Sequence, residues 1–337
     1  MGRKYFGYLP EIDPLHHYLL HDIQPQMTGI SCHAKYRVFQ LNGSNDVYLY
    51  EDACSGTKVV GKFFLSARNR DTVRAAHLVE KEFHSLHLIR NYGFTTLPHY
   101  VVRPLGYNHW LNHLLVVEYH EGTKLSDIIR AAIYHGGRER LFRKLTSLAY
   151  FLATLHNRTA HGVPVNVHDD CVYLNRLLSR LLAINAMGQN DAAEFFWLRD
   201  QWCNKQHMWE DQQVLVHGDA TPSNFLFGKG LNVVVIDLER AKRADRVFDI
   251  GRIAGELKHF FFQATGDSYA AEPFIGHFLW EYSCHFPDRL SAFRSITRRV
   301  PFHMGLTLLR IARNAWIGPE YRWQLITEAR DILRRFA

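Results

Sequence analysis

A His-Gly-Asp triplet, His217-Gly218-Asp219, is followed along the chain by Asn224 and then by Asp237. The triplet and Asp237 each come directly after a short run of apolar, β-branched residues, VLV and VVVI, which predicts that both lie at the ends of strands. Phosphoryl transfer from ATP needs one carboxylate to orient the attacking hydroxyl and accept its proton, and oxygen ligands to hold Mg²⁺ on the phosphates. We therefore predict Asp219 as the catalytic carboxylate, and Asn224 and Asp237 as ligands of Mg²⁺.

The pattern HGDxxxxN followed by IDxE resembles that of the aminoglycoside phosphotransferase and choline kinase family, over roughly residues 35 to 260. The resemblance implies an α+β, two-lobed, protein-kinase-like fold, with an antiparallel sheet and one main helix in a small mixed N-lobe and a larger, mostly helical C-lobe. It also implies an ATP- and Mg²⁺-dependent phosphotransferase, whose acceptor is a hydroxyl of a small molecule such as a sugar, an amino alcohol or an aminoglycoside.

The same resemblance implies supporting roles near the catalytic Asp. His217 is expected to be structural and to fix the loop by packing and hydrogen bonding. Asp249, in VFDIGR, matches an Asp that ties the catalytic loop from the start of a helix, and the LATLH segment is expected to lie against that loop. Glu239 is expected either to bind a second metal ion or to brace Asp237, and both alternatives stay open.

Lys62 lies late in a predicted strand, VVGKFF. In kinase-like folds a Lys at this place contacts the α- and β-phosphates, and a helix Glu holds it. Glu80 and Glu82 both qualify as that partner. We prefer Glu82, because Phe83 and Leu86 then pack inward at helical spacing.

Two further segments are expected to contact the nucleotide. LNGSNDVYLY is the predicted phosphate-covering hairpin, in which Gly43, Ser44 and Asn45 can offer backbone N–H groups, although a plain hairpin turn fits the same residues. VVEYHEGTKL resembles the hinge between kinase lobes, where backbone groups of Glu118 and His120 are expected to read the adenine.

These residues must be positioned by a recognisable order of elements. YRVFQL, DVYLYE and KVVGKFF read as strands, a helix is predicted over 71–91, and VVRPLGYN and HLLVVEYH read as two more strands. Helical periodicity dominates afterwards. We expect an N-terminal extension at 1–30, a nucleotide-binding N-lobe at 31–119, and a C-lobe at 120–337 that carries the catalytic loop and a helical acceptor-binding region.

The composition is that of an ordinary globular protein, with 47% hydrophobic and 22% charged residues in a chain of 337. No apolar stretch approaches the roughly eighteen residues of a membrane span, and MGRKYFGYLPEID has no apolar signal-peptide core. The five Cys are scattered and form no CxxC, which favours reduced thiols and a cytoplasmic location.

Much of the net charge of +7 comes from Arg residues near the C-terminus. A solvated helix face is the simpler interpretation, and a cleft for an anionic substrate is the sharper alternative. No aromatic residues interleave with the basic ones as in a nucleic-acid ribbon, so no nucleic-acid partner is expected. The residues concerned are Arg289, Arg294, Arg298, Arg299, Arg310, Arg313, Arg322, Arg330, Arg334 and Arg335.

Three rival functions are weighed against small-molecule phosphorylation. A protein Ser/Thr kinase is disfavoured, because only eleven residues separate Asp237 from Asp249, too few for an activation segment. A catalytically inactive nucleotide-binding protein is disfavoured, because all the residues of the predicted site are intact: Lys62, Asp219, Asn224 and Asp237. Transfer of a nucleotidyl group instead of a phosphoryl group stays open.

Overall fold

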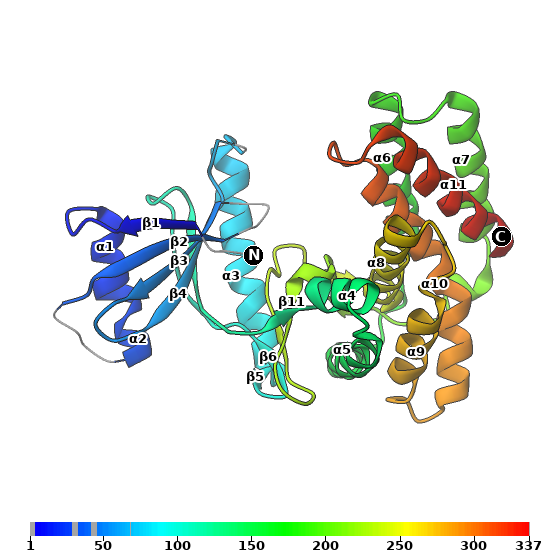
Figure 1. Cartoon of the computed structure of the whole chain (residues 1–337). Coiled ribbons are helices and arrows are strands. Elements are labelled where there is room, and N and C mark those ends of the chain that lie inside the picture. Colours follow the sequence, from blue (N-terminus) through cyan, green and yellow to red (C-terminus); the bar gives the residue numbers. More distant parts are fainter. Residues whose placement is uncertain (1–3, 29–32, 42–45, 68, 337) are drawn as a thin grey trace. The chain divides into compact units, whose positions relative to one another are not determined.

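The computed structural model describes residues 4–28, 33–41, 46–67 and 69–336 of the chain, which divide into two compact units (Figure 1). The first unit comprises Met1–Gly122 and Val234–Arg240, and the second comprises Thr123–Val233 and Ala241–Ala337. The segment that carries Asp237 and Glu239 therefore belongs to the first unit. The backbone N–H of Val102 anchors it there by donating to the carbonyl of Val235 at 3.2 Å.

An antiparallel sheet with the order β1-β2-β3-β4-β8-β7 organises the first unit. Its strands are β1 (Lys4–Tyr8), β2 (Tyr36–Leu41), β3 (Asp46–Asp52), β4 (Lys58–Phe63), β7 (Pro104–Asn108) and β8 (Leu114–Glu118). All five strands predicted for the N-lobe are present. The additional strand, β1, comes from the segment expected to be an extension, and it pairs with β2. Its side chains are mostly exposed, so it lacks the apolar alternation from which a strand can be predicted.

Helices cover both faces of this sheet. Helix α1 (Pro14–Tyr18) begins after Asp13, because the Asp13 carboxylate accepts from the backbone N–H of Leu15 at 2.8 Å. A π-helical turn, η1 (Leu19–Ile23), and α2 (Pro25–Thr28) follow. Apolar side chains of α1 and η1 pack with Val59 of β4 in the core. Since successive strand residues point to opposite faces, Lys62 lies on the other face, toward α3 (Thr72–Asn91).

The second unit is mostly helical. Its helices are α4 (Leu125–Tyr134), α5 (Arg138–Thr159), α6 (Val167–Ala183), α7 (Gln189–Cys203), α8 (Val247–Thr265), α9 (Glu272–Ser283), α10 (Arg289–Ala312) and α11 (Pro319–Phe336). Two antiparallel strand pairs accompany them: β10 (Val214–Val216) with β13 (Lys242–Ala244), and β11 (Phe225–Phe227) with β9 (Thr123–Lys124). A sheet-containing unit and a helical unit confirm the predicted α+β class.

Helices α8 and α10 pack closely because α8 carries glycine where α10 crosses it. A Cβ on Gly251 would stand 2.3 Å from the Cβ of His303, and one on Gly255 would stand 2.7 Å from the Cβ of Thr307. Any side chain at these positions would therefore push the two helices apart. In Figure 1 the two helices run past each other within the second unit.

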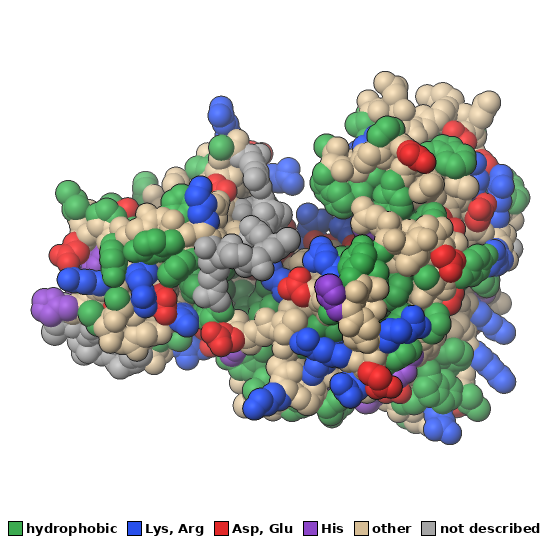
Figure 2. Space-filling view, viewed as in Figure 1, with side chains coloured by type: hydrophobic (Ala, Val, Ile, Leu, Met, Phe, Trp, Pro, Cys, Tyr) green, Lys and Arg blue, Asp and Glu red, His purple; other side chains and the backbone are tan. Residues whose placement is uncertain are grey.

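Two expectations about the surface and the thiols need correction. The prediction of reduced cysteines is wrong for Cys171 and Cys203, which form a disulfide between α6 and α7. The prediction of a solvated Arg face is wrong for Arg299, which is fully buried. On the face shown in Figure 2, Lys and Arg side chains of the second unit are interspersed with Asp and Glu. None of the helices in the described ranges has both the length and the apolar character needed to cross a membrane.

Candidate functional site

Lys62 is surrounded by three carboxylates in the first unit. Its Nζ lies 2.7 Å from Oε2 of Glu82, 2.6 Å from Oδ1 of Asp237 and 3.1 Å from Oε2 of Glu239. The structure thus brings together β4, α3 and the segment that follows β12 (Val233–Val235). One ammonium among three carboxylates leaves the cluster with net negative charge when all four groups are ionised.

Burial and mutual attraction set the protonation of this cluster. Burial alone would lower the pKa of Lys62, but attraction by Asp237, Glu82 and Glu239 outweighs it and raises that pKa well above its usual value. Burial raises the pKa of Glu82 to about 7, with repulsion from the other two carboxylates adding to it and Lys62 opposing it. Lys62 therefore stays protonated, and its ammonium group is the positive charge of the cluster.

The two candidate partners of Lys62 occupy different places on α3. Glu82 is buried and bonds Lys62, whereas Glu80 is half-buried and contacts the ring of His109 at 3.0 Å. Buried apolar neighbours on the same helix face, Val79 and Leu86, hold Glu82 toward the sheet. The geometry therefore favours Glu82 over Glu80.

Asp237 has an unusual backbone. Its φ is +64°, in the left-handed region that non-glycine residues seldom adopt. Such conformations persist where the surroundings enforce them, and they concentrate at functional sites. Oxygen atoms of Glu82, Asp237 and Glu239 all lie within 4.8 Å of one another, close enough to share one cation. The hard oxygen donors and the excess negative charge fit a divalent cation such as Mg²⁺.

In the second unit, the HGD loop follows β10 and is fixed from α8. The carboxylate of Asp249, in the first turn of α8, accepts the backbone N–H of His217 at 2.6 Å and that of Gly218 at 3.0 Å. Gly218 has φ +77°, a conformation that glycine adopts without strain. His217 itself is fully buried, and its ring lies 5.3 Å from that of Phe225 at a tilt of 55°. These contacts set the direction in which Asp219 leaves the loop.

Asp249 is held in turn by residues of α5 and α9. Nε2 of His156 lies 3.4 Å from Asp249, and Nδ1 of the same ring lies 2.8 Å from the hydroxyl of Tyr282. Burial alone would raise the pKa of Asp249, but hydrogen bonding and the charges of the two His rings hold it below its usual value. His156 belongs to the LATLH segment, which therefore does lie against the loop.

Asn224 closes the loop on its other side. It ends a 3-10 turn, η3 (Pro222–Asn224), and its Nδ2 donates to the backbone carbonyl of Asp219 at 2.9 Å. Its side-chain oxygen is therefore the atom that can ligate a cation. The short turn thus ties the orientation of Asn224 to that of Asp219.

Two arginines contact the Asp219 carboxylate. Nη1 of Arg252, from α8, lies 3.1 Å from Oδ1 of Asp219, and Nη1 of Arg310, from α10, lies 3.7 Å from the same atom. Arg310 also bonds Glu256, one turn after Arg252 on α8. Burial and the charge of Arg310 lower the pKa of Arg252, while burial raises the pKa of Glu256.

The segment expected to meet the adenine lies at the end of β8. The N–H of Glu118 donates to the carbonyl of Arg103 at 3.0 Å, and its carboxylate lies 3.2 Å from the ring of His120. The carbonyl of Glu118 and the N–H of His120 are the backbone groups that we expect to meet the adenine. The predicted phosphate-covering residues Gly43, Ser44 and Asn45 lie outside the described residues.

Comparison with known proteins shows the family of the chain. The model of the phosphotransferase enzyme family matches residues 35–284, about three quarters of the chain. The chain belongs to this family. A comparison with curated proteins found no matching relative.

Solved structures share the fold of this phosphotransferase family member. An ethanolamine kinase from Plasmodium vivax matches with a TM-score of 0.61 at 13% identity, covering 96% of this chain and 89% of that one. The choline kinase LicA from Streptococcus pneumoniae matches at 0.54 and 15%, covering 96% and 100%. An ADP-bound aminoglycoside phosphotransferase matches at 0.53 and 14%, covering 93% and 97%. At these identities the likeness shows the fold, and it confirms the predicted kinase-like architecture.

Sequence reasoning missed Arg252, Glu256 and the contact of Arg310 with Asp219. Asp249, Arg252 and Glu256 are spaced by three and four residues, so they share one face of α8, and this spacing was the available signal. Arg310 gives no local signal, because only the packing of α10 on α8 brings it near.

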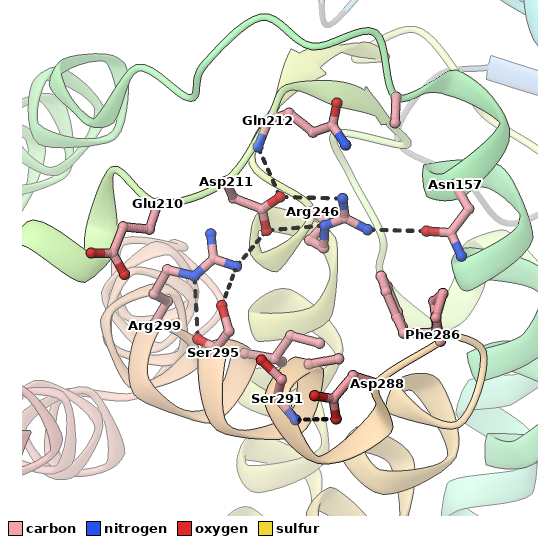
Figure 3. A pocket seen from close by; sticks show the side chains of 14 residues that line it. Asn157, Glu210, Asp211, Gln212, Arg246, Phe286, Asp288, Ser291, Ser295 and Arg299 are labelled. Atoms are coloured by element: carbon pink, nitrogen blue, oxygen red, sulfur yellow. Dashed lines mark hydrogen bonds and ion pairs between the residues drawn. The ribbon is translucent and has the colours of Figure 1, made fainter.

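A pocket of about 420 Å³ lies elsewhere in the second unit, beside α10 (Figure 3). Its central carboxylate, Asp211, accepts hydrogen bonds from Nε and Nη2 of Arg246 at 3.1 and 3.2 Å. It also accepts one from Nη2 of Arg299 at 2.5 Å. Arg246 also donates to Asn157 at 3.1 Å. The charges that line this pocket thus pair with one another in a buried network.

Proposed function

We propose that this family member is an ATP- and Mg²⁺-dependent phosphotransferase that phosphorylates a hydroxyl of a small molecule. The observation that carries the proposal is the fixed HGD loop, in which Asp249 holds two consecutive N–H groups and thereby aims the Asp219 carboxylate. Membership of the phosphotransferase family and the Lys62 cluster support it.

In the proposed reaction Asp219 orients the acceptor hydroxyl and accepts its proton. The acceptor oxygen forms a bond to the γ-phosphorus of ATP, while the bond between that phosphorus and the β,γ-bridging oxygen breaks. The products are the phosphate ester and ADP, and the proton passes from Asp219 to solvent. Catalysis consists mainly of positioning and neutralising charge.

The remaining residues serve the nucleotide. Lys62, braced by Glu82, contacts the phosphates, and the backbone of Glu118 and His120 reads the adenine. Asp237 and Asn224 are the residues that would hold Mg²⁺, whose charge neutralises the phosphates. Glu239 lies 3.1 Å from Lys62, and a role in bracing that cluster fits this contact.

From the sequence, we also propose that Gly43, Ser44 and Asn45 cover the phosphates through their N–H groups. A protein substrate is disfavoured, because the residues between Asp237 and Asp249 form only β13 and the start of α8. No segment there can serve as a peptide-docking platform.

The test measures acceptor-dependent release of ADP from ATP in the presence of Mg²⁺. The acceptors are a panel of sugars, amino alcohols, hydroxy acids and aminoglycosides, and a panel of proteins serves as the contrast. Release with at least one small alcohol, abolished by chelation of Mg²⁺, is expected. Phosphorylation of proteins but of no small alcohol would overturn the proposal. So would nucleotide binding without any acceptor-dependent turnover.

A further inference from the structure

Two guanidinium groups gather beside Asp219. Arg252 and Arg310 both contact its Oδ1, as described above. Arg252 lies over the ring of Phe248 at 5.3 Å, and Nζ of Lys242 lies 4.1 Å from the centre of the same ring. All of these residues belong to the second unit. The two guanidinium groups thus face two carboxylates, Asp219 and Glu256.

The arginines are buried but not fully used. The side chain of Arg252 is 5% exposed and that of Arg310 is 13% exposed. Among the described residues, neither Nε atom has a hydrogen-bond partner. Leaving a buried donor unpaired costs about 1–3 kcal/mol, so folded proteins usually satisfy such groups with protein, water or ligand.

The rigid packing of α8 on α10 fixes both guanidinium groups. Arg252 lies between Gly251 and Gly255, at the close helix crossing, and Arg310 lies three residues beyond Thr307, which contacts Gly255 there. Fixed, planar guanidinium groups suit bidentate binding of carboxylate or phosphate. A quaternary ammonium or polyamine acceptor would instead be repelled by them.

We propose that Arg252 and Arg310 bind an anionic group of the acceptor, a carboxylate or phosphate on the molecule whose hydroxyl is phosphorylated. This inference rests on the proposed function, because it needs Asp219 to orient the acceptor. It assigns the substrate to hydroxy acids or phosphate-bearing alcohols, in place of amino alcohols or aminoglycosides.

The test uses the full chain with matched acceptors that differ in charge: glycerate and glycerol 3-phosphate as anions, glycerol as the neutral alcohol, and choline and ethanolamine as cations. Turnover is expected to be highest with an anionic member. In Arg310→Gln, the KM of that acceptor should rise about 10- to 100-fold, the cost of a hydrogen bond to a charged group. The KM of ATP should stay unchanged.

Arg310→Lys, which keeps the charge but loses the planar fork, should restore part of the affinity. Arg294→Gln serves as the matched control, because Arg294 is an exposed arginine on the same helix. Circular dichroism and thermal melting establish that each variant is folded. A second readout is the thermal shift caused by glycerol 3-phosphate, which should be present in the wild type and lost in Arg310→Gln.

Turnover restricted to cations would overturn the inference while the proposed function stood. An equal fall in kcat for every acceptor, with KM unchanged, would place the arginines on the transferred phosphoryl group and would also overturn it. Anion binding that depends on Arg310 without any turnover would support the inference and count against the proposed function. If the anions were neither bound nor phosphorylated, the inference would be overturned.

Discussion

At the scale of single residues, Asp237 combines a strained backbone conformation with a place in a charged cluster. It holds a left-handed conformation and lies 2.6 Å from Lys62, in a cluster with more carboxylates than cations. A cation bound by Asp237 together with the phosphates of ATP, as we propose, would relieve the excess negative charge. The left-handed backbone of Asp237 would then hold its carboxylate in place for that binding.

Asp237→Asn should therefore weaken Mg²⁺-dependent binding of ATP at least about tenfold, since metal sites lose this much even when a residue behind the ligands is changed. Isothermal titration calorimetry with and without Mg²⁺ measures the effect. Glu80→Gln is the matched control, because it removes a half-exposed carboxylate of the same helix that contacts His109 and does not contact Lys62. Unchanged affinity for Mg·ATP in Asp237→Asn would contradict the assignment.

Asp249 is the residue on which the geometry of the HGD loop depends. Asp249→Asn removes the charge that accepts the N–H groups of His217 and Gly218, so Asp219 should lose its fixed direction. We expect kcat to fall about 10- to 100-fold, as for a lost hydrogen bond to a charged group, with ATP affinity retained.

Steady-state kinetics and nucleotide titration check this expectation. Asp267→Asn, an exposed carboxylate just beyond the other end of α8, should behave as the wild type. A normal kcat in Asp249→Asn would show that the loop keeps its shape without this carboxylate.

At the scale of elements, the crossing of α8 and α10 decides which side chains meet. Gly251→Ala places a methyl group 2.3 Å from the Cβ of His303. We expect the free energy of unfolding to fall by about 1–3 kcal/mol, the usual cost of overpacking. Gly276→Ala in α9 is the control, because nothing lies within 4 Å of its added Cβ and alanine favours the helix. Urea unfolding of both variants separates the effect of the steric clash from that of helix propensity. Equal free energies of unfolding for the two variants would contradict the close packing of α8 on α10.

The same elements show what could be predicted from the sequence. Strands β2, β3 and β4 have apolar alternation and turn residues between them, and these local signals located Lys62 correctly on a strand. The strand β1 has exposed side chains and depends on pairing with β2, so no local signal exists. Motif spacing identified the HGD loop, and helical spacing on α3 favoured Glu82.

Contacts between distant helices escaped prediction. Arg310 meets Asp219 only because glycines on α8 admit α10, and helix periodicity cannot supply that information. The Cys171–Cys203 disulfide escaped for the same reason, since spacing alone does not say which thiols come together. Arg299 was expected at the surface, because a helical Arg is usually solvated, yet its ion pairs with Asp211 and Asp245 bury it.

At the scale of the whole molecule, the buried ion network around Asp211 ties the loop before β10 to α8 and α10. Asp211→Asn leaves two buried arginines with less compensation, so we expect about 3 kcal/mol less stability at neutral pH. Glu210→Gln is the matched control: Glu210 is exposed, and Figure 3 shows no bond between it and the other residues drawn. Urea unfolding monitored by tryptophan fluorescence measures both.

The effect of Asp211 should depend on pH in a defined direction. Burial would raise its pKa, but Arg299 and Arg246 outweigh burial and lower it below the ordinary value of 3.8. The carboxylate therefore contributes full stability above that ordinary value, and the contribution is lost as the pH falls through the lower folded-state pKa. The difference between wild type and Asp211→Asn should shrink only in strong acid. A difference that shrinks between pH 7 and pH 5 would contradict this origin.

We propose that the chain moves the γ-phosphoryl group of ATP to a small alcohol through Asp219. The most direct measurement uses ATP labelled at the γ-phosphorus with the acceptor panel, and mass spectrometry of the product, for the wild type and Asp219→Asn. We predict a labelled phosphate ester with the wild type, and a turnover about 10²- to 10⁴-fold lower with Asp219→Asn while ATP binding persists. A product carrying the nucleotidyl group, or equal turnover by the two proteins, would contradict the claim.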